Sequence, residues 1–326
     1  MYSSYSSLQQ SQLAAQGYYD TQSTYLLVYA PGRNTALRAT LADQLHRKFR
    51  LADTLGSALT EGVDGVLLVS EDVECMSTAL MCFAKALQDG ADYAVCNAVF
   101  GFGGATALYQ SRAHLAQNRC ALVSRPLLER CRAAAKDPEN VTELLALAAQ
   151  FCAHPARIPQ ALLHYERDIC AEDAFSATGK RAFLMSHVLD MTGAPIVLVS
   201  AVPVLRSMGY EVVVLGPSDG GALQLFVDAG AAVITRPGIR ATPNLWGLAL
   251  CTDLVLVNTV VMARTVRALS GTAVPVLWWL HDAFAGYPHI AHQIPTKLAE
   301  NVRLYSVGHH AANAMHAVRP EFEIRP

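Results

Sequence analysis

The second half of the chain alternates short apolar runs with helical stretches, and this alternation constrains the fold more than any other feature. Apolar runs of strand length occupy residues 181–187, 209–217, 231–237, 252–259, 274–282 and 302–308. Helical patterns separate them, and the first is entered at Pro195, a residue that suits the first turn of a helix. Strands that alternate with helices of this length form right-handed βαβ units around a parallel sheet. The sequence therefore predicts a doubly wound α/β domain over 181–326.

Polar clusters follow four of these apolar runs at their carboxyl ends. The clusters are Ser186-His187, Gly216-Pro217-Ser218-Asp219, Asn258-Thr259 and His281-Asp282. In a parallel sheet the carboxyl ends of the strands lie at one edge, and ligands bind beyond that edge. A single cluster of this kind is an ordinary loop, whereas four at the same edge predict a ligand site.

The segment SHVLDMTGAP (186–195) joins the first of these strands to its helix. Gly193 lacks a Cβ, so backbone N–H groups at the helix start can approach a phosphate or sugar oxygen, although a simple tight turn explains it too. His187 either hydrogen-bonds a ligand hydroxyl group or ties the loop down. His281 either orients a bound hydroxyl group or is a structural histidine. We expect Trp278 and Trp279 to belong to the core.

The first half of the chain also has an α/β pattern. Strands are predicted over 24–30, 64–74 and 91–100, and helices over 34–49, 75–90 and 139–152. The segment 168–181 mixes charged and small residues, which predicts a linker over 169–180. Residues 1–24 are polar and rich in Ser, Gln and Tyr, which predicts a disordered tail. We therefore expect two Rossmann-like α/β domains, 25–168 and 181–326.

Composition excludes several classes of protein. The chain has 326 residues, 52% of them hydrophobic and 16% charged, so it can bury a substantial core. Its formal net charge of −2 gives no footprint for nucleic acid. The most apolar window, 194–216, is broken by Pro203, Arg206 and Glu211, so no membrane span is expected. The eight scattered cysteines are typical of reduced, buried residues in a cytoplasmic protein.

A resemblance to a known family rests on the residues quoted next. SHVLDMTGAPIVLVSAVPVLRSMGYEVVVLGPSDGG (186–221) is similar to the opening βαβ unit of family 4 glycosyltransferases, in the N-terminal domain of their GT-B fold. Members read strand, S-H-x-x-x-x-x-G-A, helix, and then G-x-E-V-x-V-L. The later stretches VLVNTVV, VPVLWWLHDA and LYSVGHHAANAM resemble further landmarks of that domain, so the resemblance covers 181–326 almost continuously.

The resemblance implies transfer of a sugar from a nucleotide-sugar donor to a glycan acceptor such as a cell-surface polysaccharide, with retention of configuration. His281 and Asp282 would then be catalytic. The residues implied in substrate binding are Ser186, His187, Thr192, Gly193, Ala194 and Asn258. Such enzymes usually need no metal, because helix N-termini and basic side chains take the phosphate charge. They carry a second Rossmann domain that holds the donor, so a missing C-terminal domain or a partner chain is expected.

The first half resembles, more faintly, a family 2 glycosyltransferase domain with the GT-A fold. GVLLVSEDVECMSTALMCFAKALQDGADYAV (65–95) is similar to the strand with the D-x-D metal loop and the helix and strand that follow. Ser70 stands where the family has its first carboxylate, and ENVTELL replaces the acidic pair before the last helix. We therefore expect a degenerate, inactive module. Glu71 and Asp72, with Glu74, can bind a divalent cation, although a solvated acidic loop is the simpler interpretation.

Two other classes of function stay open from the sequence. One is a non-catalytic carbohydrate- or nucleotide-binding remnant that kept the fold without the donor domain. The other is an oxidoreductase with a nucleotide cofactor, but the chain lacks the G-x-G-x-x-G motif with an acidic residue about 20 positions on.

Overall fold

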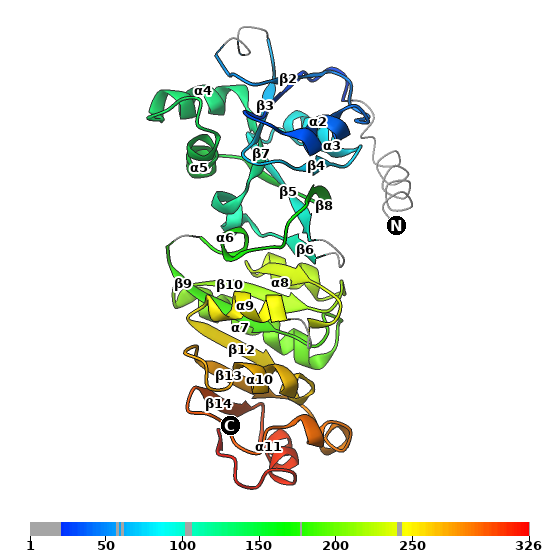
Figure 1. The fold of residues 1–326 in the computed structure, drawn as a ribbon, viewed down its shortest axis with the longest axis vertical. Coiled ribbons are helices and arrows are strands. Elements are labelled where there is room, and N and C mark those ends of the chain that lie inside the picture. Colours follow the sequence, from blue (N-terminus) through cyan, green and yellow to red (C-terminus); the bar gives the residue numbers. More distant parts are fainter. Residues whose placement is uncertain are drawn as a thin grey trace. The chain divides into compact units, whose positions relative to one another are not determined.

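The computed structural model describes residues 21–56, 59, 62–101, 106–176, 178–239 and 243–325. The chain divides into two compact units, Met1–Ile169 and Cys170–Pro326, and each is a sheet with helices packed on it (Figure 1). The predicted α/β fold class is confirmed.

The sheet of the second unit is parallel throughout. Its strands are β9 (Lys180–Met185), β10 (Tyr210–Gly216), β11 (Ala232–Thr235), β12 (Leu254–Asn258), β13 (Val276–Leu280), β14 (Val302–Ser306) and β15 (Ile324–Arg325). Their spatial order is β15-β14-β13-β12-β9-β10-β11. Numbered from β9, the first six strands have the 3-2-1-4-5-6 order of a doubly wound Rossmann sheet, and β15 adds a seventh strand beside β14, so the predicted topology is confirmed. The order reverses between β9 and β12.

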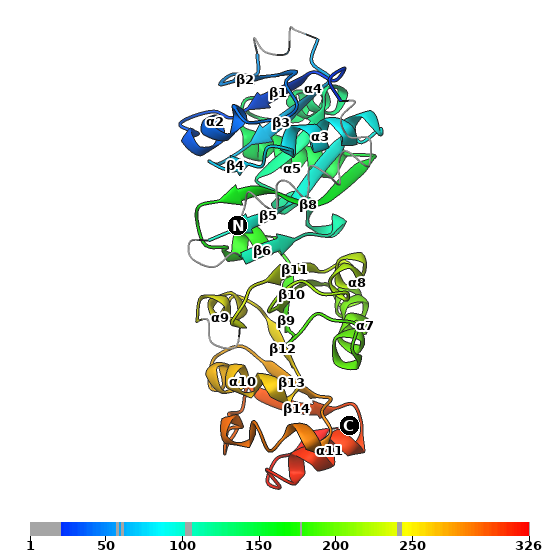
Figure 2. The ribbon, with the colours of Figure 1, turned by 90° about the vertical axis from the view of Figure 1, so that its right-hand side faces the viewer.

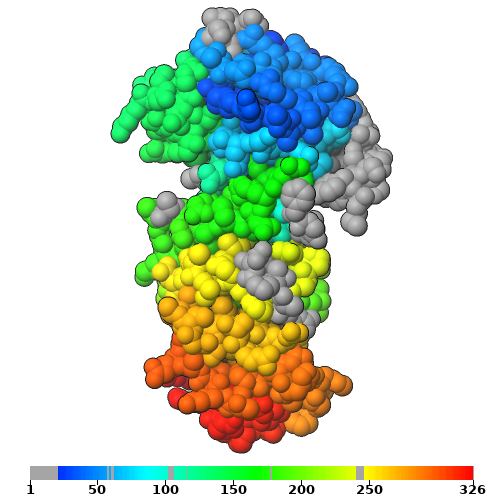
Figure 3. Space-filling view, in the orientation of Figure 1, coloured from blue at the N-terminus to red at the C-terminus, as the bar shows by residue number. Residues whose placement is uncertain are grey.

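Helices cover both faces of this sheet. They are α6 (Ala171–Ala174), α7 (Gly193–Ser207), α8 (Leu223–Asp228), α9 (Pro243–Leu250), α10 (Ala263–Leu269) and α11 (His309–His316), with 3-10 turns η4 (Val260–Met262), η5 (Phe284–Gly286) and η6 (Ala291–Gln293). Figure 2 shows α7 and α8 on one side of the sheet and α9 and α10 on the other. In the space-filling view, the surface of the second unit changes from yellow through orange to red in chain order (Figure 3).

Burial explains why these runs form strands. Ala182, Phe183, Leu184 and Met185 of β9 are all inaccessible to solvent, as expected for a central parallel strand covered on both faces. Complete burial of one such large side chain contributes roughly 1.5–3 kcal/mol. Burial of the continuous apolar runs therefore offsets the conformational entropy that the chain loses when the sheet forms.

Glycines let two loops of the second unit lie against each other. A Cβ at Gly216 would collide with the Leu189 side chain, and one at Gly220 would collide with the Leu189 carbonyl group. Leu189 O also accepts the Ala222 N–H at 2.9 Å. The glycines of GPSDGG therefore permit close packing of the loop that precedes α7.

The sheet of the first unit is mixed. Its strands are β1 (Leu26–Tyr29), β2 (Phe49–Ala52), β3 (Gly65–Val69), β4 (Glu74–Cys75), β5 (Tyr93–Phe100), β6 (Thr106–Tyr109), β7 (Cys120–Ser124) and β8 (Pro155–Tyr165). They run in the order β2-β1-β3-β7-β5-β6, and β8 pairs with β5 and β4. The strand β7 is antiparallel to both β3 and β5.

The helices of the first unit are α2 (Thr35–Leu41), α3 (Ala79–Gln88), η2 (Arg112–Gln117), α4 (Arg125–Ala134) and α5 (Val141–Phe151). The helix predicted over 34–49 is wrong beyond Leu41. Gln44 is buried there and its amide donates to Met76 O at 2.9 Å, so tertiary contacts outweigh the helical pattern.

Four expectations about the rest of the chain are compared with the structure here, for the tail, the linker, the cysteines and a membrane span. Residues 21–24 of the predicted tail are ordered, since Thr21 is buried and its hydroxyl lies 3.1 Å from His46 Nδ1; residues 1–20 lie outside the described residues. The predicted linker contains α6 and the buried Phe175. No cysteine forms a disulfide among the described residues, and of the eight only Cys251 is exposed. No described helix is both long and apolar enough to cross a membrane.

Candidate active site

The point where the strand order of the second unit reverses carries a buried amide. Asn258, at the end of β12, is fully buried, and its Nδ2 donates to Ala194 O in the first turn of α7 at 3.1 Å. Its Oδ1 is buried and has no hydrogen-bond partner. An unsatisfied buried acceptor costs folding free energy unless a further group supplies its hydrogen bond, so Asn258 Oδ1 is available to a polar ligand.

The first turn of α7 is open. Thr192 occupies the N-cap position, but its side chain does not cap the helix and bonds to Asp190 instead. A Cβ added at Gly193 would meet no atom within 4 Å. Helix N-termini with free space and free N–H groups favour anions. The predicted role of Gly193 is therefore sterically possible.

His281 and Asp282 follow β13 and are electrostatically distinct. Burial, followed by the nearby His187, lowers the pKa of His281 to about 4, so its ring is neutral at pH 7. His281 Nε2 is buried without a partner, and the ring lies against Trp279 with 4.9 Å between centroids. Burial raises the pKa of Asp282, although its Oδ2 accepts the Val260 N–H at 2.6 Å.

His187 connects the loop after β9 to the end of β12. Its Nδ1 lies 3.2 Å from Thr259 Oγ1. Its charge also acts on the pKa values of both His281 and Asp282, so all three groups are neighbours. Of the two roles left open for His187, the structure shows the loop-tying contact.

Thr259 has an unusual backbone. Its φ of 71° and ψ of 160° lie in a region that is almost reserved for glycine, and no other non-glycine residue of the described chain has a positive φ. Such a conformation costs roughly 1–3 kcal/mol and occurs mainly at functional sites. The sequence groups Thr259 with Asn258 but gives no sign of this strain.

Two further buried hydroxyl groups at this edge escaped the sequence analysis. Tyr287 is fully buried and its hydroxyl group has no partner; burial and then Asp282 raise its pKa. Ser306, at the end of β14, also has a buried Oγ without a partner. Tyr287 lies in an irregular segment, where no periodicity marks a residue as inward-facing.

The structure thus brings together most of the predicted site residues. His187, Ala194, Asn258, His281 and Asp282 join through the contacts above. Ser186 is fully buried but its Oγ donates to Val188 O at 2.6 Å, which is a contact within the loop. The Thr192 side chain is exposed and takes no part.

The two tryptophans differ from the expectation that both belong to the core. Trp278 is fully buried, and its Nε1–H donates to Thr259 O at 2.8 Å. Trp279 is half-buried and lines a cavity of about 360 Å³ with Leu277 and Tyr305. Alternation along β13 places the two rings on opposite faces of the sheet.

The carboxylates of the acidic loop in the first unit are engaged with protein groups. Glu71 pairs with Arg167 at 2.6 Å, and Glu74 lies 2.6 Å from His164 Nδ1. Asp72 accepts the N–H groups of the first three residues of α2 at 3.0–3.1 Å. Although burial alone would raise its pKa, these hydrogen bonds lower it. No cluster of three metal-binding side chains occurs among the described residues.

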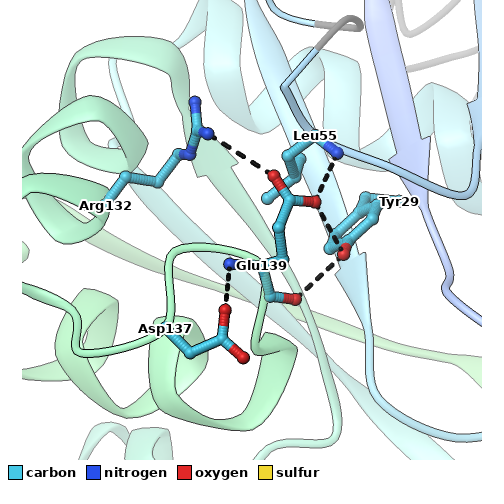
Figure 4. A network of polar contacts seen from close by, with 5 residues as sticks. All are labelled: Tyr29, Leu55, Arg132, Asp137 and Glu139. Atoms are coloured by element: carbon cyan, nitrogen blue, oxygen red, sulfur yellow. Dashed lines mark hydrogen bonds and ion pairs between the residues drawn. The ribbon is translucent and has the colours of Figure 1, made fainter.

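A further carboxylate of the first unit, that of Glu139, is also engaged with protein groups (Figure 4). Glu139 Oε2 accepts the Leu55 N–H at 2.7 Å and the Tyr29 hydroxyl at 3.1 Å, and Oε1 lies 3.4 Å from Arg132. Burial and then Glu139 raise the pKa of Tyr29 to about 12. Glu139 therefore ties α5 to the ends of β1 and β2.

Comparison with known proteins bears on the second unit. Residues 178–316 match the family model described as glycosyl-transferase family 4. The second unit is similar to family 4 glycosyltransferases. Searches of curated proteins and of solved structures found no significant match. The family match includes every site residue from Ser186 to Asp282 but no residue before 178, so the GT-A resemblance of 25–168 stays a prediction.

Proposed function

We propose that the second unit is the acceptor-side domain of a glycosyltransferase, which transfers a sugar from a nucleotide-sugar to a glycan such as a cell-surface polysaccharide. One observation carries this proposal. Within the segment that matches family 4, buried polar atoms of Asn258 and His281 lack partners at the edge where the strand order reverses. Ligands of doubly wound sheets bind at that point.

His281 is suited to hold the acceptor. Its ring is neutral near pH 7, so an imidazole nitrogen can accept a hydrogen bond from a sugar hydroxyl group. Asp282 is fixed by the Val260 N–H and lies close enough to His187 for the two side chains to interact electrostatically. In this account His281 positions the attacking oxygen of the acceptor. The Asp282 carboxylate supplies negative charge near an oxocarbenium-like transition state.

The start of α7 is suited to the donor phosphates. Its N–H groups and the helix dipole favour the charge that develops on the leaving diphosphate, and Gly193 leaves the approach open. The proposal assigns this charge to the protein rather than to a metal ion. It also includes a second domain, joined to this chain or in a partner chain, that supplies further donor contacts.

The experiment is nucleotide-sugar binding and hydrolysis by the 326-residue chain, its His281→Ala variant and its Gly193→Val variant. A Cβ added at residue 193 meets no atom within 4 Å, so the Gly193→Val variant should keep its fold while its side chain covers the helix start. Gly247→Val in α9 is the matched control, because Gly247 also has no atom within 4 Å of an added Cβ.

We expect micromolar to millimolar binding that both site variants weaken and the control does not. Binding that is unchanged in both site variants would place the donor elsewhere. Binding without hydrolysis in every chain, including one supplied with acceptor glycans, would favour a carbohydrate- or nucleotide-binding protein.

A further inference from the structure

Thr259 holds its strained conformation through contacts on every side. Its N–H donates to Trp279 O at 2.8 Å, and its carbonyl accepts the Trp278 Nε1–H at 2.8 Å. Its Oγ1 contacts His187 Nδ1 at 3.2 Å. The residue is itself almost completely buried. The strand β13 and the loop after β9 therefore hold this residue in place.

A glycine would adopt this conformation without strain. The chain uses glycine at all its other described positions of positive φ, including Gly209 and Gly230. Threonine, a β-branched residue, therefore occupies a backbone conformation at residue 259 that glycine would adopt at a lower energy. The contribution that glycine cannot make is the hydroxyl group, and that group contacts His187.

The strained backbone of Thr259 also sets the direction of the Val260 N–H group. Immediately after Thr259, the Val260 N–H donates to Asp282 Oδ2 at 2.6 Å. Immediately before it, Asn258 reaches Ala194 O in α7. One turn thus links three elements of the site: the loop after β9 through His187, the start of α7, and the loop after β13 through Asp282.

We infer that Thr259 is a positioning residue, whose hydroxyl group fixes the ring orientation and tautomer of His187 beside Asp282 and His281. As a role in catalysis this rests on the proposed function, whereas the contact with His187 does not. In a neutral histidine, the hydrogen bond made by one ring nitrogen determines which of the two ring nitrogens carries the proton. Loss of Oγ1 should therefore change the tautomer population of His187.

The test uses the full chain labelled with ¹⁵N-histidine and three variants, Thr259→Ser, Thr259→Val and Thr259→Gly. Serine keeps the hydroxyl group, valine keeps the branched shape without it, and glycine removes both the hydroxyl group and the strain. An effect shared by valine and glycine therefore belongs to the hydroxyl group, and the glycine variant should fold even if the valine variant does not. Thr272→Val is the control, since its hydroxyl group donates to Leu269 O and accepts from Asn301 Nδ2, outside the proposed site.

We expect the His187 ring nitrogen signals to move in Thr259→Val and Thr259→Gly and to stay in place in Thr259→Ser and Thr272→Val. Affinity for UDP-glucose or GDP-mannose, whichever the wild-type chain binds, should fall about tenfold or more in the first two variants and recover with serine. Unchanged His187 signals in both variants, or serine as disruptive as valine, would overturn the inference. So would unchanged affinity despite moved signals. Expected signals with no binding by the wild-type chain would overturn the proposed function instead and leave the Thr259–His187 contact standing.

Discussion

The two units of this chain place polar residues at comparable positions and use them in opposite ways. In the first unit, carboxylates that follow β3 or precede α5 are all engaged: Asp72 caps α2, Glu71 pairs with Arg167, and Glu139 accepts from Leu55 and Tyr29. In the second unit, buried atoms of Asn258 and His281 have no partner. A position beyond a strand end does not by itself make a site, and our proposal rests on the unsatisfied atoms of Asn258 and His281.

The difference has an energetic meaning. A buried polar group without a partner costs roughly 1–3 kcal/mol, and a ligand that supplies the missing hydrogen bond recovers that cost. In our proposal, the edge of the second unit therefore destabilises the protein without ligand and favours the bound state. The carboxylates of the first unit contribute to folding already and have little left to offer a ligand.

The largest expected effect comes from His281→Phe, which keeps a ring beside Trp279 and removes the unsatisfied nitrogen. Turnover or affinity for the nucleotide-sugar should fall roughly 100-fold, as for loss of a positioned acid–base group. The free energy of unfolding, measured by denaturant titration, should rise by about 1 kcal/mol. A His281→Phe variant that loses stability and keeps its activity would show that His281 contributes to folding rather than to ligand binding.

Glu139→Ala should behave in the opposite way. It leaves the Leu55 N–H and Arg132 without their acceptor, so denaturant titration should show a loss of about 2 kcal/mol. Nucleotide-sugar binding should not change. Glu129→Ala is the control, because the exposed Arg125–Glu129 pair should contribute less than about 0.5 kcal/mol. Equal losses in the two variants would show that Glu139 contributes no more to stability than an exposed ion pair does.

The pH dependence of stability sharpens the contrast further. The folded-state pKa of His281 is about 4, below its ordinary value of 6.5, so the stability linked to it is present above pH 6.5 and is lost as the pH falls toward 4. The wild-type chain should lose about 1–2 kcal/mol more than His281→Phe between pH 7 and pH 4.5. Parallel profiles for the two proteins would mean that the ring is solvated.

The smallest effect is expected for Asp72→Ala. Removing the carboxylate that accepts from the first turn of α2 should cost about 1 kcal/mol. Mg²⁺ or Mn²⁺ should not stabilise the wild-type chain against heat, since Asp72 is already committed to the helix. A metal-dependent rise in melting temperature that Asp72→Ala abolishes would restore the cation site.

Sequence periodicity predicted the architecture of the second unit but only some residues of its candidate site. Continuous apolar runs such as β9 and β10 are buried on both faces, and each one ends where a polar cluster begins. This pattern placed His187, Asn258 and His281 at one edge. The end of the predicted helix over 34–49 was wrong because Gln44 bonds across to Met76, a tertiary contact that no local pattern carries.

The missed residues share a physical reason. Thr259 matters because of its φ, Tyr287 because an irregular segment buries it, and Leu189 because glycines let it pack on the next loop. None of these three features can be predicted from hydrophobic periodicity or from a residue type that is typical of catalytic or binding sites. Each depends on which segments lie side by side once the sheet has formed.

The most direct test of the contrast is a titration of the ¹⁵N-histidine-labelled chain with UDP-glucose and GDP-mannose, followed by NMR up to millimolar concentration. Our account predicts shifts in the signals of His187 and His281, and none for His46 and His164 in the first unit. Shifts of His164, beside the acidic loop, with His187 and His281 unmoved would contradict the account and place the ligand site in the first unit.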